Sequence, residues 1–163
     1  MLSRIREERL SAIPAPVDSR LFSDELISAR SHVLELISRH LTAFGDQFPA
    51  ETCRNGYYPL TDNVEWTTSF WTGQLWLAWE MSGETTFREM AEKHVRSFGL
   101  RIAGRNDTNT HDLGFLYTLS CVAAWRLTGN REARGFALLA AEALLERFHP
   151  KAKIIQAWGD LSD

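Results

Sequence analysis

One acidic residue, Asp112, is the residue best placed to do chemistry. It directly precedes an apolar stretch, residues 113–125, that contains no charged side chain. A carboxyl group at such a position can give up a proton and take one back during a reaction. Capping of the following helix is an equally open interpretation, because aspartate is frequent at helix N-termini. His111 is a second polar candidate, although a lone histidine is weak evidence and can be a surface neighbour of the cap.

The six tryptophans indicate what such a carboxyl group could act on. Trp71, Trp76 and Trp79 lie in one apolar segment and are predicted to be core residues, since aromatic rings bury well. Trp66 is instead predicted at the start of a helix, and Trp158 in a loop. Flat apolar rings beside a carboxylate and an imidazole suit a sugar ring, which presents C–H faces and hydroxyl edges.

The elements that would position these residues recur along the chain. Ala-Trp-Glu-Met-Ser-Gly at 78–83 aligns with Ala-Trp-Arg-Leu-Thr-Gly at 124–129, an offset of 46 residues. The same offset superposes Arg88 on Arg134 and Trp66 on Asp112. Each copy indicates an apolar helix, a Ser/Thr-Gly turn and an amphipathic helix.

The two helices of each copy differ in their apolar pattern. The first, within 66–79 and within 113–125, is apolar on every side, and such a helix must be covered on every side. The second carries its apolar residues at helical spacing on one face: Phe87, Met90, Ala91, His94, Val95 and Phe98 in the first copy, and Ala137, Ala140, Ala141, Leu144 and Phe148 in the second. Buried and half-exposed helices therefore alternate, which predicts an inner and an outer layer.

Residues that break or end helices predict how the chain is organised. Residues 1–22 are charged and broken by Pro14 and Pro16, so we expect an N-terminal arm there. A helix is predicted from Ser23 to the residue before Gly45, followed by a long loop over 46–64. Residues 23–163 would form one all-α domain of helical hairpins. Closing a ring of six such hairpins would take about 276 residues, so we expect this domain to be incomplete at its C-terminus, or its open flank to be covered by self-association.

Composition excludes several classes of function. The 163 residues are 44% hydrophobic with a net charge of −3, and the basic residues are scattered, so no nucleic-acid partner is expected. No apolar stretch approaches the roughly 18 residues that span a bilayer. Cys53 and Cys121 give neither a disulfide framework nor a metal spacing. With no signal-peptide core at the start, we expect a cytoplasmic protein without a metal site.

Several linked motifs resemble the unsaturated glucuronyl hydrolases, glycoside hydrolase family 88. They occur in the family's order and spacing over about residues 24–160: Phe-Gly-Asp-Gln-Phe-Pro at 44–49, Asn-Val-Glu-Trp-Thr-Thr-Ser-Phe-Trp-Thr-Gly at 63–73, Leu-Trp-Leu-Ala-Trp-Glu at 75–80, His-Asp-Leu-Gly-Phe-Leu-Tyr at 111–117 and Ile-Ile-Gln-Ala-Trp-Gly at 154–159. The chain is similar to the N-terminal half of such an enzyme. The resemblance implies about half of an (α/α)6 toroid, a ring of six helical hairpins.

The resemblance also implies an activity. These enzymes act on the terminal Δ4,5-unsaturated uronic acid that polysaccharide lyases leave on oligosaccharides. Rather than displacing at the anomeric carbon, they protonate C4 and add water at C5. The hemiketal then opens and releases the neighbouring sugar. No metal or organic cofactor is implied.

Four residues carry the implied site. Asp112 matches the family's acid/base aspartate, His111 the histidine beside it, and Trp66 and Trp158 two tryptophans that contact sugar. The family's second essential aspartate lies beyond the Gln-Ala-Trp-Gly segment, so we expect impaired activity in this chain. Two alternatives stay open: an unsaturated rhamnogalacturonyl hydrolase with the same chemistry, and a non-catalytic helical-repeat interaction module.

Overall fold

Helices dominate the computed structural model, which describes residues 23–157 and 159. The predicted arm, residues 1–22, and Trp158 lie outside the described residues. Helix α1 spans Ser23–Phe44, and a two-stranded hairpin, β1 (Phe48–Pro49) with β2 (Leu60–Thr61), follows it. The predicted helix and its end before Gly45 are confirmed, while the predicted loop over 46–64 contains this short hairpin.

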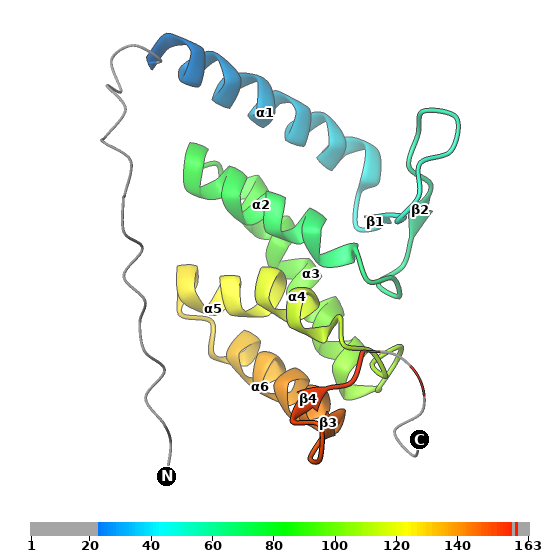
Figure 1. The fold of residues 1–163 in the computed structure, drawn as a ribbon. Helices are drawn as coiled ribbons and strands as arrows, with labels where there is room; N and C mark the ends of the chain where they lie inside the picture. Colours follow the sequence, from blue (N-terminus) through cyan, green and yellow to red (C-terminus); the bar gives the residue numbers. More distant parts are fainter. Residues whose placement is uncertain (1–22, 158, 160–163) are drawn as a thin grey trace, which may run out of the picture.

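Two helical hairpins follow (Figure 1). They contribute most residues of the core. The first consists of α2 (Thr68–Ser82) and α3 (Thr85–Ala103). The second begins with a continuous helical run, α4 (Leu113–Tyr117), the π-helical segment η1 (Thr118–Val122) and α5 (Ala123–Thr128), and ends with α6 (Arg131–Leu145). A last two-stranded hairpin pairs β3 (Phe148–His149) with β4 (Ile154–Ile155).

The two predicted layers are present. Helix α2 packs against the α4–η1–α5 run in one layer, and α3 packs against α6 in the other. The inner layer contributes Trp71, Leu75 and Trp76 to the core, and α3 contributes the face predicted for it, including Phe87 and Phe98. Cys121 is a fully buried core residue.

The 46-residue repeat is visible in individual contacts as well as in the path of the chain. Gly83 and Gly129 end the inner helices at φ 76° and 74°, left-handed conformations that glycine adopts without strain. The Arg88 guanidinium lies 5.2 Å from the centre of the Trp79 ring, and that of Arg134 lies 5.5 Å from the Trp125 ring. Equivalent side chains therefore make equivalent contacts in both hairpins.

The structure departs from the sequence-based expectations on two faces. The inner helices are not covered on every side, since Phe70 and Leu77 of α2 are 43% and 56% exposed. On α6, Ala140 is buried as predicted but Ala141 is exposed. The helix ends at Leu145, so Phe148 belongs to a strand and is exposed rather than part of the predicted buried face.

Candidate functional site

The loops that precede the two inner helices form a cleft of about 290 Å³. Trp66 lies in the loop before α2, and Asp112 is the last residue before α4. Both side chains line this cleft, so the structure brings together two of the four residues proposed from the sequence. The cleft is further lined by Val64, Arg101, Asp107, Asn109 and Thr110.

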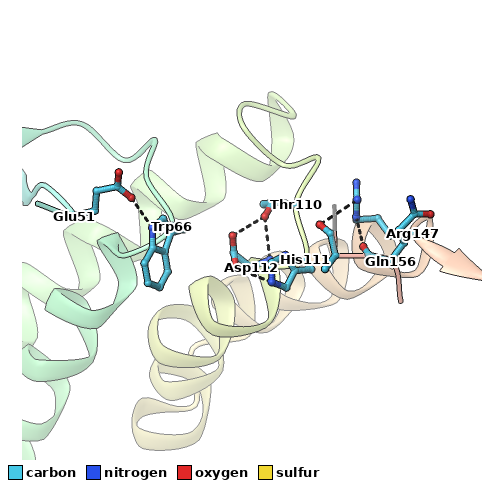
Figure 2. Close-up of polar contacts among 8 residues, drawn as sticks. Glu51, Trp66, Thr110, His111, Asp112, Arg147 and Gln156 are labelled. Carbon is cyan, nitrogen blue, oxygen red and sulfur yellow. Dashed lines mark hydrogen bonds and ion pairs between the residues drawn. The ribbon is translucent and has the colours of Figure 1, made fainter. Parts of the chain in front are cut away.

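The Asp112 side chain is held by its neighbours in the loop (Figure 2). Thr110 Oγ1 donates to Asp112 Oδ2 at 2.7 Å and accepts from the Asp112 backbone N–H at 3.1 Å. His111 Nε2 lies 3.4 Å from the other carboxylate oxygen. Asp112 occupies the N-cap position of α4, yet its side chain makes no capping hydrogen bond. Its carboxylate is therefore oriented by the loop and not by the helix backbone.

Asp112 and His111 differ in exposure. The Asp112 side chain is 13% exposed and that of His111 is 31% exposed. The carboxylate therefore lies in a largely desolvated place at the wall of the cleft, beside the more exposed imidazole. A carboxyl group in contact with an imidazole, at the edge of a cleft, can transfer a proton to a bound molecule.

Trp66 forms the aromatic wall of the cleft and is 44% exposed. Its indole Nε1 donates to Glu51 Oε2 at 2.5 Å, and Glu51 comes from the loop between β1 and β2. The Trp66 ring also meets Phe70 and Phe115, with centroids 6.2 and 6.3 Å away. An indole fixed at its nitrogen and edge, but with much of its surface exposed, can stack on an apolar face of a ligand.

Arg101, near the end of α3, is 4% exposed and ties the cleft loops together. Its Nη1 donates to Asn63 Oδ1 at 3.0 Å and to the Glu65 carbonyl at 2.9 Å. Its Nη2 donates to the carbonyls of Val64 at 3.0 Å and Asp107 at 3.2 Å. Burial lowers the pKa of this guanidinium, and nearby acidic groups, Asp107 and Asp112 among them, oppose that shift.

Arg147 has the equivalent position after α6 and is 3% exposed. It donates to the Gln156 carbonyl at 2.8 Å (Figure 2). It also donates to the Asn109 side chain and to the Ala157 carbonyl, the latter at 3.3 Å. The contacted carbonyls directly precede Trp158, the fourth proposed site residue, whose placement lies outside the described residues.

Sequence reasoning missed four residues of this site: Glu51, Arg101, Thr110 and Arg147. The offset of 46 could have revealed two of them, because it relates Arg101 to Arg147 just as it relates Asn63 to Asn109. Glu51 and Thr110 carry no comparable signal, since an exposed glutamate and a loop threonine are ordinary residues in any loop.

Three further features of the described residues concern a metal site, a second hollow and a membrane span. In the described part of the chain, no group of three or more His, Cys, Asp or Glu side chains could hold a metal ion. A second hollow of about 300 Å³ lies between α1 and α2, and its lining includes Phe44, Phe70 and Trp71 but not Asp112. Among the helices described, none is long and apolar enough to cross a bilayer.

Comparisons with known proteins agree on one group of enzymes. No protein-family model matches the chain. An unsaturated chondroitin disaccharide hydrolase of Streptococcus pneumoniae is 44% identical over 86% of this chain and 36% of its own length. An unsaturated glucuronyl hydrolase of a Bacillus species is 42% identical over 80% of this chain and 34% of its own length. The chain thus spans little more than a third of these curated relatives.

Solved structures give the same picture for the fold. The unsaturated glucuronyl hydrolase of Streptococcus agalactiae superposes with a TM-score of 0.83 at 36% identity, over 93% of this chain and 40% of that one. The Bacillus enzyme superposes with a TM-score of 0.75 at 42% identity, over 78% of this chain and 34% of that one. The helical hairpins described above therefore correspond to part of a larger helical glycosidase fold.

Proposed function

We propose that the protein to which this chain belongs hydrates the 4,5 double bond of a terminal unsaturated uronic acid. The premise is that the chain is related to the unsaturated glucuronyl hydrolases and corresponds to part of one. The observation that carries the proposal is the loop-held carboxylate of Asp112 in one cleft with the half-exposed Trp66 ring. Hydration of this double bond leads to release of the neighbouring sugar.

In the proposed reaction Asp112 serves first as acid and then as base. Its carboxyl proton goes to C4 of the enol ether, and the electron pair of the double bond forms the new C–H bond. Positive charge then develops on C5 and the ring oxygen, and the negative carboxylate stabilises it. Water adds to C5 and gives its proton to Asp112, which restores the carboxyl group. The resulting hemiketal opens and the neighbouring sugar leaves.

The remaining proposed residues bind the sugar. Trp66 offers a ring surface to the C–H face, His111 offers an imidazole beside Asp112, and we assign Trp158 a second aromatic contact. A solved Streptococcus agalactiae unsaturated glucuronyl hydrolase is complexed with dGlcA-GalNAc6S, which supports an unsaturated uronyl oligosaccharide as the substrate class here. We place this activity in the cytoplasm, because Cys53 and Cys121 are free thiols and thiols persist in reducing compartments.

The test measures both turnover and binding of an unsaturated uronyl disaccharide. Turnover is followed by loss of the ultraviolet absorbance of the double bond, and binding by the change in tryptophan fluorescence. Asp112→Asn should abolish turnover and leave binding within a few-fold, because the amide keeps the shape but cannot supply the proton. Asp107→Asn, which removes another carboxylate from the same cleft, is the matched control and should retain turnover.

Either of two outcomes would contradict the proposal. One is turnover that survives Asp112→Asn at the level of the Asp107→Asn control. The other is a chain that neither turns over nor binds the disaccharide. A panel that includes an unsaturated rhamnogalacturonyl disaccharide decides between the two substrate classes that the sequence left open.

A further inference from the structure

The two buried arginines make the same kind of contact in both repeats. Arg101 and Arg147 are 46 positions apart, and each donates to the asparagine found 38 residues before it, Asn63 or Asn109. Each arginine also donates to backbone carbonyls of irregular segments near the cleft. We call these two sets of hydrogen bonds the first clamp (Arg101) and the second clamp (Arg147).

Each clamp joins loops that are otherwise far apart in the chain. The first clamp holds the carbonyls of Val64 and Glu65, next to Trp66, and also the carbonyl of Asp107 from the loop before Asp112. The second clamp holds the Asn109 side chain from that same loop and the carbonyls of Gln156 and Ala157. Both arginines therefore donate hydrogen bonds to the loop before Asp112.

The chemistry of these contacts argues for a purpose beyond packing. A buried charge costs free energy, and here the hydrogen-bond acceptors are neutral oxygens that do not cancel that charge. A guanidinium is planar, rigid and always protonated, with five donors in fixed directions. It can therefore fix several carbonyls in one plane, which a hydrophobic side chain of similar volume cannot do.

We propose that Arg101 and Arg147 are positioning residues. They fix the relative positions of three segments around one cleft: the loop that bears Trp66, the loop that bears Asp112, and the segment that leads to Trp158. The inference rests on the proposed function for the identity of the site, but the clamps themselves are defined by hydrogen bonds. The first clamp acts mainly on the aromatic wall that binds sugar. The second acts on the loop that holds the Asp112 carboxylate.

Amide hydrogen exchange tests the second clamp without any need for turnover. The reporters are Asp112 N–H, bonded to Thr110 Oγ1, and Gln156 N–H, bonded to the Arg147 carbonyl at 2.9 Å. In Arg147→Met both amides should exchange about tenfold faster, since charge-assisted hydrogen bonds to the loops are lost. Exchange in α2 should stay unchanged. Arg96→Met is the matched control, because Arg96 is an exposed arginine on α3 that lies outside both loops.

A milder pair of variants guards against misfolding of Arg147→Met. Asn109 is exposed, so Asn109→Ala should fold, speed exchange at Asp112 and weaken disaccharide binding several-fold. Asn109→Asp keeps an acceptor for the guanidinium and should restore both values. Asn109→Leu keeps a branched side chain but offers no acceptor, so it should not restore them, whereas it would if Asn109 acted only by filling space.

The outcomes separate this inference from the proposed function. Equal acceleration of exchange in α2 and in the loops, or unchanged exchange at Asp112 and Gln156, would overturn the positioning role. Faster exchange confined to the loops, with a rescue by Asn109→Asp, supports it even if no disaccharide binds. That last result would support the positioning role of the clamps and contradict the proposed substrate.

Discussion

At the scale of single residues, the orientation of one carboxylate decides what the cleft can do. Asp112 stands at a helix start, where an aspartate usually accepts hydrogen bonds from the first backbone N–H groups. Here Thr110 supplies the hydroxyl donor instead, and the helix N–H groups donate no hydrogen bond to the side chain. One carboxylate oxygen is thus fixed by the threonine, while the other faces His111.

The threonine contact gives the first prediction. Thr110→Val removes the hydroxyl that holds Asp112 Oδ2 at 2.7 Å but keeps the branched shape. We expect the variant to lose about 1 to 1.5 kcal/mol of the interaction that orients the carboxylate, which is the typical value of one hydrogen bond. The value of kcat should therefore be about tenfold lower. Thr110→Ser keeps the hydroxyl and serves as the control. Equal rates in the two variants would show that the hydroxyl does not orient the acid.

A second prediction concerns His94, which is buried on α3 between Phe48 and Thr72. Burial lowers the pKa of His94 to about 4 from its ordinary 6.5, with Asp46 opposing and Lys93 reinforcing the shift. Below pH 6.5 the unfolded chain binds a proton that the folded chain refuses. The free energy of unfolding should therefore fall by about 3 kcal/mol between pH 7 and pH 4 through this group alone.

Denaturant unfolding at several pH values checks the His94 prediction. His94→Gln removes the titrating group, so the stability difference between the two proteins should shrink towards pH 4. Parallel pH profiles for the two proteins would contradict the assignment, because other groups would then account for all of the acid sensitivity.

At the scale of elements, the crossing of α3 and α6 depends on one glycine. A Cβ atom placed on Gly99 would lie 2.4 Å from the Phe136 ring, far inside van der Waals contact. Gly135 lies on the exposed side of α6 with nothing within 4 Å of the same position. The two glycines therefore have opposite roles in neighbouring helices.

This contrast gives a matched pair of substitutions. Gly99→Ala should destabilise the fold by about 1 to 3 kcal/mol, because the helices must separate or Phe136 must move. Gly135→Ala should stabilise it by about 0.5 to 1 kcal/mol, since alanine favours the helix. Thermal unfolding measures both shifts. A gain in stability for Gly99→Ala would show that the helices do not cross as closely as described.

At the scale of the whole molecule, apolar faces remain exposed on several helices. Leu138 and Leu145 are one heptad apart on α6, on the same face, and are 48% and 64% exposed. Phe70 and Leu77 show the same spacing on α2. Apolar surface of this kind is usually covered by another element or another chain.

We therefore expect the 163-residue chain to self-associate as its concentration rises, which sedimentation velocity would detect. Replacing Leu138 and Leu145 by glutamate should lower the associated fraction, because charges are costly to bury at an apolar contact. Leu100→Glu, at an exposed position on α3, is the control. A single sedimenting species at all concentrations would rule out this association.

The sequence alone determined what depends on neighbours along the chain. The period of 46 residues, the buried face of α3, the turn glycines and the place of Asp112 at a helix start all follow from local pattern, because helical periodicity and capping are set within a few residues. The family resemblance rested on the same local motifs.

The tertiary structure alone decided which loops meet. Glu51 reaches Trp66 across 15 residues, and Arg147 reaches Asn109 across 38, distances at which no pattern along the chain specifies a contact. The same reason explains the early end of α6 and the exposure of Phe148, since coverage of a face depends on which element packs there. Residue types predicted an acid and an aromatic side chain that bind a sugar. Only the tertiary structure placed this acid and this aromatic side chain in one cleft.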